Sequence, residues 1–142
     1  MQTMAQLLAE KGISVSSITP GATVLEGLQV MADMDIGALV VIDQGRPIGL
    51  VSERDYTRKV ILRGRSSRDT PVSAIMVTAF ATAPPDATVD MCMNLMTRQR
   101  TRHVLIMDGE RLCGIVSIGD LVRATIDDQK FTIAQMEKYI HS

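Results

Sequence analysis

The chain has 142 residues, of which 46% are apolar and 3% aromatic, with ten Met and no Trp. This length is typical of one domain and allows a core without disulfides or metals, so we expect an aliphatic, Met-rich core. Fifteen basic and sixteen acidic side chains give a net charge of −1. That balance excludes polyanion binding driven by whole-chain charge, although it leaves room for a local basic pocket.

Two cysteines, Cys92 and Cys113, lie in apolar stretches outside any CxxC pattern. We therefore expect buried free thiols in a reducing compartment and no metal site. The first residues carry no basic region of the kind that starts a signal peptide, and no apolar run approaches the ~20 residues needed to span a bilayer. A cytoplasmic protein without membrane contacts is expected.

The first half of the chain predicts a short helix followed by five elements. The helix covers residues 3–11 and is ended by Gly12. Thr23 predicts the N-cap of a longer helix, because its hydroxyl and the carboxylate of Glu26 can satisfy unpaired amides in a capping box. The elements are an extended stretch, an amphipathic helix, an aliphatic strand, a strand returning from a hairpin turn, and a helix capped by a serine. In this order, the first four cover residues 15–18, 24–33, 38–42 and 48–51, and the last helix begins at Ser52.

A polar linker over residues 63–70 follows, and Pro71 predicts a short helical turn. The same five elements then recur at residues 80–83, 89–99, 104–107, 113–116 and Ser117. A last helix is predicted over residues 128–140, with Ile133, Met136 and Ile140 on one face.

The recurrence is an internal repeat. Residues 20–61 align without a gap with residues 85–126, and thirteen of the 42 aligned positions are identical. Roughly three would match by chance at ordinary composition. Two copies are too few for a solenoid, so they favour an α/β fold in which two β-α-β-β-α repeats are related by a pseudo-twofold axis. The predicted segments are an N-terminal helix (1–12), a first repeat (13–62), a linker (63–76), a second repeat (77–127) and a C-terminal helix (128–142).

Both copies carry the pattern G-h-h-S-x-x-D, where h is aliphatic, at residues 49–55 and 114–120. The spacing places a serine at a helix N-cap and a carboxylate in the first turn. A carboxylate fixed there can accept hydrogen bonds from the vicinal hydroxyls of a ribose, as an acidic residue does in dinucleotide folds. Plain helix capping is the alternative for either copy alone. The appearance of the whole pattern in both copies favours a binding role.

These two segments, the Pro-x-Ala-Thr-Val helix starts and the aliphatic strands ending in Asp43 and Asp108 resemble the CBS (cystathionine-β-synthase) domain. The pair resembles a Bateman module over residues 13–127, similar to stand-alone bacterial two-CBS proteins. The resemblance implies a regulatory module rather than an enzyme. It further implies an adenosine-containing ligand, such as AMP, ATP or NAD(H), bound in two clefts between the copies.

The resemblance also implies which residues bind the nucleotide. In the family the signature Asp holds the ribose, and the start of the middle strand of the other copy contacts base and phosphate. Carried over, the first cleft joins Ser52, Asp55, Thr82, Arg102 and His103. The second cleft joins Ser117, Asp120, Ser17, Ile36, Gly37 and Ala38.

The two clefts are not expected to be equal. Residues 98–103 are basic, whereas the aligned residues 33–38 are acidic or neutral. Because guanidinium groups bind phosphate strongly, the first cleft is the expected phosphate site. Arg54 and Arg58 share one helix face and could reach a polyphosphate, and Arg123 matches Arg58 in the second copy. A solvated face or a partner-binding patch is the alternative for these arginines.

The sequence also bears on macromolecular partners. A second apolar face on the two long helices (Leu25, Val30, Met34, Met91 and Leu95) predicts a homodimer, and an additional intrachain contact is the alternative. Nucleic-acid binding is not expected, because the chain has only two Tyr and two Phe for base stacking. The alternative function is a protein–protein interaction module that regulates an unknown partner without a small ligand.

Overall fold

The computed structural model describes residues 2–12 and 15–141. The chain forms two compact units, each built around one repeat. The first-repeat unit comprises Ser14–Phe80 and Glu110–Leu112, and the second-repeat unit comprises Met1–Ile13, Ala81–Gly109 and Cys113–Ser142. The N-terminal helix therefore belongs to the second-repeat unit, although it precedes the first repeat in the sequence. The ends of the predicted segments at positions 1, 13 and 142 lie outside the described residues.

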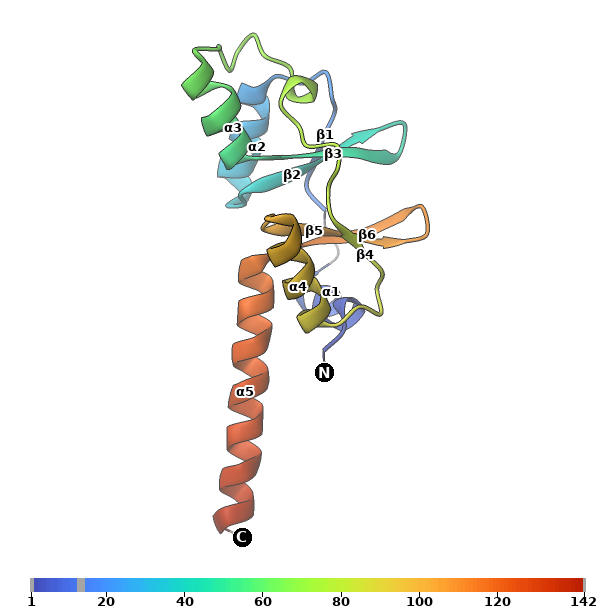
Figure 1. Cartoon of the computed structure of the whole chain (residues 1–142), viewed down its shortest axis with the longest axis vertical. Helices are drawn as coiled ribbons and strands as arrows, with labels where there is room; N and C mark the ends of the chain where they lie inside the picture. Colours follow the sequence, from blue (N-terminus) through green and yellow to red (C-terminus); the bar gives the residue numbers. More distant parts are fainter. Residues whose placement is uncertain (1, 13–14, 142) are drawn as a thin grey trace. The chain divides into compact units, whose positions relative to one another are not determined.

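The first-repeat unit follows the predicted order of elements (Figure 1). Two 3-10 turns, η1 and η2, complete it, and Pro71 stands at the N-cap of the second, as predicted. The elements are β1 (Ser17–Ile18), α2 (Val24–Met34), β2 (Ala38–Asp43), β3 (Arg46–Ser52), α3 (Glu53–Lys59), η1 (Ile61–Arg63) and η2 (Val72–Ala74).

The sheet of this unit has the order β1-β2-β3. β1 is parallel to β2 and β2 is antiparallel to β3, with Ala38 paired to Ser52. At the hairpin, Gln44 and Gly45 both have positive φ, at 51° and 77°, which a type I′ turn requires. The pairing of β2 with β3 places the start of β2 beside the serine that caps α3.

The second-repeat unit repeats this plan with the sheet order β4-β5-β6. Its elements are α1 (Met4–Lys11), β4 (Thr82–Ala83), α4 (Val89–Gln99), β5 (His103–Asp108), β6 (Arg111–Ser117) and α5 (Ile118–His141). One expectation is wrong. The helix capped by Ser117 and the C-terminal helix are not separate, because α5 runs without a break through residues 127 and 128 (Figure 1).

Capping and burial explain the two long helices. The hydroxyls of Thr23 and Thr88 accept hydrogen bonds from the backbone amides of Glu26 and Met91, at 3.1 and 3.2 Å. At Thr23 this hydrogen bond is the hydroxyl half of the predicted capping box. One stripe of each helix enters the core of its own unit. The buried members of these stripes are Val24 and Met31 on α2, and Val89, Cys92 and Met96 on α4. Cys92 is fully buried as expected, whereas Cys113 is half-buried.

Each repeat is completed by the segment that precedes the other repeat. In the first-repeat unit, the amides of Val72 and Ser73 donate to the carbonyls of Ala22 and Pro20, at 2.8 and 3.1 Å. In the second-repeat unit, the amides of Met4 and Ala5 donate to Ala87 and Pro85, the aligned carbonyls, at 2.8 and 2.9 Å. The start of α1 and the start of η2 therefore occupy equivalent places.

The same equivalence extends to the signature glycines. A Cβ added at Gly114 would lie 2.7 Å from Leu8 Cδ2, and one added at Gly49 would lie 2.6 Å from Met76 Sδ. Real Cβ atoms do not come this close to other atoms, so a larger residue at either glycine would displace the Leu8 or Met76 side chain that crosses the sheet there. This close approach fixes α1 against β6 and thereby positions the end of α1 near the signature of the second repeat.

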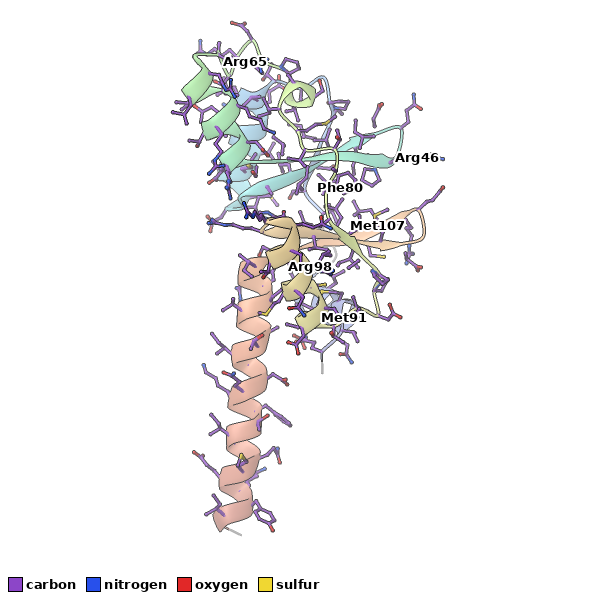
Figure 2. All side chains as sticks on the ribbon, viewed as in Figure 1. Arg46, Arg65, Phe80, Met91, Arg98 and Met107 are labelled. Carbon is purple, nitrogen blue, oxygen red and sulfur yellow. The ribbon has the colours of Figure 1, made fainter. Side chains whose placement is uncertain are left out.

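The predicted second apolar face is exposed only in part. Met34 and Met91 are 54% and 57% exposed, and Figure 2 shows Met91 on α4. Val30 and Leu95 instead pack against the core of their own units. A homodimer through these helices therefore stays a prediction. Within residues 2–12 and 15–141, no helix is both long and apolar enough to cross a membrane.

Candidate functional site

The signature serine and aspartate form the same hydrogen-bonded pair in both units. The Ser52 amide donates to Asp55 Oδ2 at 2.9 Å, and the Asp55 amide donates to Ser52 Oγ at 3.3 Å. At Ser117 and Asp120 the corresponding distances are 2.8 and 3.2 Å. Both pairs therefore cap the helix that follows them, and both aspartate side chains are only 13% exposed. Capping uses Oδ2 of each carboxylate and fixes the direction of Oδ1.

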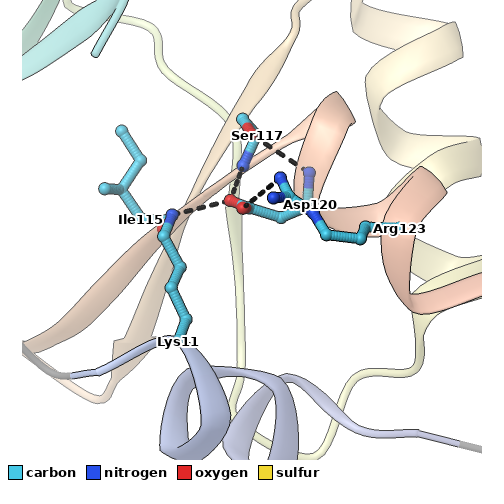
Figure 3. Close-up of polar contacts among 5 residues, drawn as sticks. All are labelled: Lys11, Ile115, Ser117, Asp120 and Arg123. Atoms are coloured by element: carbon cyan, nitrogen blue, oxygen red, sulfur yellow. Dashed lines mark hydrogen bonds and ion pairs between the residues drawn. The ribbon is translucent and has the colours of Figure 1, made fainter. Parts of the chain in front are cut away.

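In the second-repeat unit, α1 supplies a cation to this carboxylate. Lys11 Nζ lies 2.6 Å from Asp120 Oδ2 and donates to the carbonyl of Ile115 at 3.0 Å (Figure 3). Arg123 Nη2 approaches the other oxygen, Oδ1, at 3.7 Å, which is beyond hydrogen-bond distance. Oδ1 therefore retains the capacity to accept hydrogen bonds from a ligand.

The environment of Asp120 keeps it ionised. Burial is the largest single influence and raises its pKa, but several contacts act in the opposite direction. The hydrogen bond and the positive charge of Lys11, together with the hydrogen bonds from Ser117, outweigh burial and lower the pKa. The carboxylate is thus a preformed acceptor at neutral pH.

A cavity of about 320 Å³ lies beside Asp120. Its wall is formed by α1 and the first turns of α5, both from the second-repeat unit. The lining residues are Leu7, Glu10, Lys11, Asp120, Arg123, Ala124 and Asp127. The cavity thus combines an apolar wall with two cations and three acids, which are groups that can bind both the hydroxyls and the anionic part of a small ligand.

In the first-repeat unit the cation comes from the signature helix itself. Lys59 Nζ lies 3.2 Å from Asp55 Oδ1 and donates to the carbonyl of Ile75 at 2.8 Å. Ser52 Oγ also donates to Asp55 Oδ2, at 3.0 Å. Each signature aspartate therefore faces one lysine that is anchored to a backbone carbonyl, but the two lysines come from unrelated elements.

The other predicted residues divide between the units. Ser17, Ile36, Gly37, Ala38, Arg54 and Arg58 belong to the first-repeat unit, and Thr82, Arg102, His103 and Arg123 belong to the second-repeat unit. Arg54, Arg58, Arg102 and Arg123 are all exposed.

Within each unit the start of the middle strand lies beside the signature. The Glu53 amide donates to the Gly37 carbonyl at 3.1 Å, and the Ile118 amide donates to the Arg102 carbonyl at 2.9 Å. Each unit therefore brings one signature pair together with one strand start. The crossed pairing, in which each signature shares a cleft with the strand start of the other copy, stays a prediction, as does the ranking of the clefts.

Lys11 and Lys59 were not among the predicted site residues. Lys59 could have been found, because it stands four residues after Asp55 on one helix, a spacing at which opposite charges meet. Lys11 could not, since 109 positions separate it from Asp120 and no spacing rule connects them.

The chain is similar to known proteins over both repeats. The CBS domain family model matches residues 8–61 and 72–127. The CBS domain-containing protein CBSX3, mitochondrial, of Arabidopsis thaliana is 35% identical, and the match covers 97% of this chain and 71% of that protein. A solved CBS-domain protein from Burkholderia ambifaria is 42% identical, with a TM-score of 0.86 over 90% of this chain and 96% of the other.

A third relative was solved with a ligand. The CBS domain protein PAE2072 from Pyrobaculum aerophilum, complexed with AMP, is 26% identical, with a TM-score of 0.74 over 84% of this chain and 89% of the other. Each of the two family matches contains one of the two signature pairs. The chain belongs to the CBS-domain family and carries two CBS domains in tandem.

Proposed function

We propose that this CBS pair is a regulatory module that binds an adenosine-containing nucleotide and holds the ribose through its signature aspartates. One observation carries the proposal. The Asp120 carboxylate is largely buried, oriented by Ser117 and situated on the wall of a cavity that also holds Lys11 and Arg123. The AMP complex of PAE2072 supports the choice of an adenine nucleotide.

The chemistry of the cavity assigns a part to each group. Asp120 Oδ1 accepts hydrogen bonds from the two ribose hydroxyls, because Oδ2 is already used by the Ser117 amide and by Lys11. Lys11 and Arg123 neutralise the phosphate, and Leu7 with Ala124 contributes apolar contact. Small-molecule sites range from about 300 to 1,000 Å³, so a cavity of about 320 Å³ is large enough for a small ligand such as a mononucleotide.

Calorimetry with AMP tests this assignment. Asp120→Asn keeps the shape of the side chain and an acceptor for the Ser117 amide, but it removes the negative charge that strengthens hydrogen bonds to the ribose. We expect AMP affinity to fall by about tenfold or more, since a hydrogen bond to a charged group contributes roughly 1.5–3 kcal/mol. Asp128→Asn makes the same charge change on α5 at an exposed residue outside the cavity lining and serves as the matched control, with little change expected.

A second variant tests the phosphate assignment. Lys11→Met removes one cation while keeping the length of the side chain. The preference of the protein for AMP over adenosine is therefore expected to fall, and the preference of the wild type is expected to weaken as salt is added. An absence of binding of AMP, ATP and NAD(H) to the wild type would refute the proposal and favour a module that regulates a partner without a small ligand.

A further inference from the structure

The second half of α5 carries an apolar stripe that the unit itself does not bury. α5 packs against α4 through its first turns, where Leu121 is fully buried. From Ile126 to Ile140 every residue is exposed. Figure 1 shows this part of the helix continuing beyond α4 and α1 of the same unit. The stripe is therefore available to another helix.

The stripe follows the spacing of a coiled coil. Its residues alternate at steps of four and three, which gives the 3.5-residue period of a two-helix seam. The seam residues are Val122, Ile126, Gln129, Ile133, Met136 and Ile140. The five apolar members are between 44% and 71% exposed. A single polar residue, Gln129, lies near the middle of the seam.

The seam is complementary to itself when one copy is reversed. In an antiparallel pair centred near residue 131, Val122 meets Ile140 of a second copy and Ile126 meets Met136. Gln129 then meets Ile133. Every layer of the seam therefore pairs with another seam layer, and four of the six layers in the pair are wholly apolar.

The charges beside the seam favour the same orientation. Arg123, Lys130 and Glu137 follow one flank of the seam at steps of seven residues. When one copy is reversed, Arg123 lies beside Glu137 of the second copy and the reverse contact also forms, while the two Lys130 side chains face each other. In a parallel pair this flank faces Thr125 and Thr132, so the two attractive contacts exist only in the antiparallel arrangement.

We propose that α5 binds α5 of a second copy as an antiparallel two-helix coiled coil through this seam. Ten apolar side chains, about half exposed in each copy, would bury on the order of 1,000 Å² in total, which is about the lower limit for a specific interface. The seam itself does not depend on nucleotide binding, although Arg123 both lines the proposed nucleotide cavity and belongs to the charged flank.

Chemical cross-linking of the full chain tests the pairing directly. Lys130→Cys places a thiol on the flank that faces itself in the antiparallel pair, so a short bismaleimide is expected to link two copies. Phe131→Cys is the matched control, because Phe131 is 64% exposed but lies on the opposite side of the helix. Cross-linking of the wild type gives the background from Cys113. Equal yields from the two variants would overturn the proposal.

Further substitutions test whether pairing uses the seam residues in particular and whether the two helices are antiparallel. In the Lys130→Cys protein, Ile133→Glu is expected to reduce the yield at least tenfold, whereas Phe131→Glu leaves it unchanged. Glu137→Arg is expected to reduce it several-fold by opposing Arg123 of the second copy, although a cation near the end of a helix stabilises that helix. Asp128→Arg makes the same charge change away from the seam and is expected to have little effect.

A gain in pairing is also expected. Gln129→Leu makes every layer of the seam apolar, so the yield at low protein concentration is expected to rise several-fold. Circular dichroism of each variant checks that the helix content is unchanged. If Phe131→Glu lowers the yield and Ile133→Glu does not, another face of α5 mediates the contact and the seam assignment is refuted.

Discussion

Replacement of Gly114 by alanine tests how α1 is fixed against the second repeat. The added Cβ would lie 2.7 Å from Leu8 Cδ2 and 3.0 Å from Leu8 Cδ1. Leu8 is 7% exposed and belongs to the core of the second-repeat unit, so it has little space into which to move. Overpacking of this kind costs about 1–3 kcal/mol, and the lower backbone entropy of alanine in the unfolded chain offsets roughly 0.4–1 kcal/mol of it. A net loss of about 1–2 kcal/mol is expected.

Urea denaturation followed by circular dichroism measures this loss, and a double-mutant cycle assigns it. Leu8→Ala alone is expected to cost about 2–5 kcal/mol. In the double variant the new methyl group occupies space that Leu8 has left. The stability loss of the double variant should therefore be smaller than the sum of the two single losses, by more than about 0.5 kcal/mol. Gly119→Ala is the control, because its nearest neighbour lies at 3.6 Å. Additive losses would refute the contact between α1 and β6.

Three further outcomes follow from the site and the core. The pKa of Asp120 is lower in the folded protein than in the unfolded chain, so the ionised carboxylate stabilises the fold. This contribution is complete above the unfolded-state pKa of about 3.9 and is lost as pH falls through the folded-state pKa. Asp120→Asn should therefore lose less stability than the wild type when urea denaturation is repeated at increasingly acidic pH. Ser52→Ala removes a helix cap and should cost about 0.5–2 kcal/mol in the same assay. Burial raises the pKa of the Cys92 thiol, so a thiol reagent should modify Cys92 only on unfolding, and rapid modification of the native protein would contradict the described core.

The elements of each repeat could be predicted because their signals are local. Thr23 and Thr88 mark helix starts, the aliphatic runs mark buried strands, and the positive φ of Gln44 and Gly45 matches a turn that the sequence suggests. The predicted break in α5 had no such signal. That break was placed where the repeat alignment ends, at residue 126. Residues 120–142 contain neither glycine nor proline, so no residue in this stretch ends the helix.

The segments exchanged between the repeats could not be predicted. Residues 2–5 and 70–73 take equivalent places through backbone hydrogen bonds, which leave no shared side-chain pattern. For the same reason the sequence placed α1 as a flanking helix and missed Lys11, whose role depends on that exchange. Contacts between distant segments that use main-chain atoms are invisible to spacing rules.

The most direct test of the proposed function compares AMP with 2′,3′-dideoxy-AMP by calorimetry. If the signature aspartates hold the ribose, removal of both hydroxyls lowers affinity about tenfold or more, and the Asp55→Asn/Asp120→Asn double variant binds the two nucleotides with nearly equal, weak affinity. Equal binding of both nucleotides to the wild type would contradict ribose recognition by these carboxylates, and their role would then be limited to capping α3 and α5.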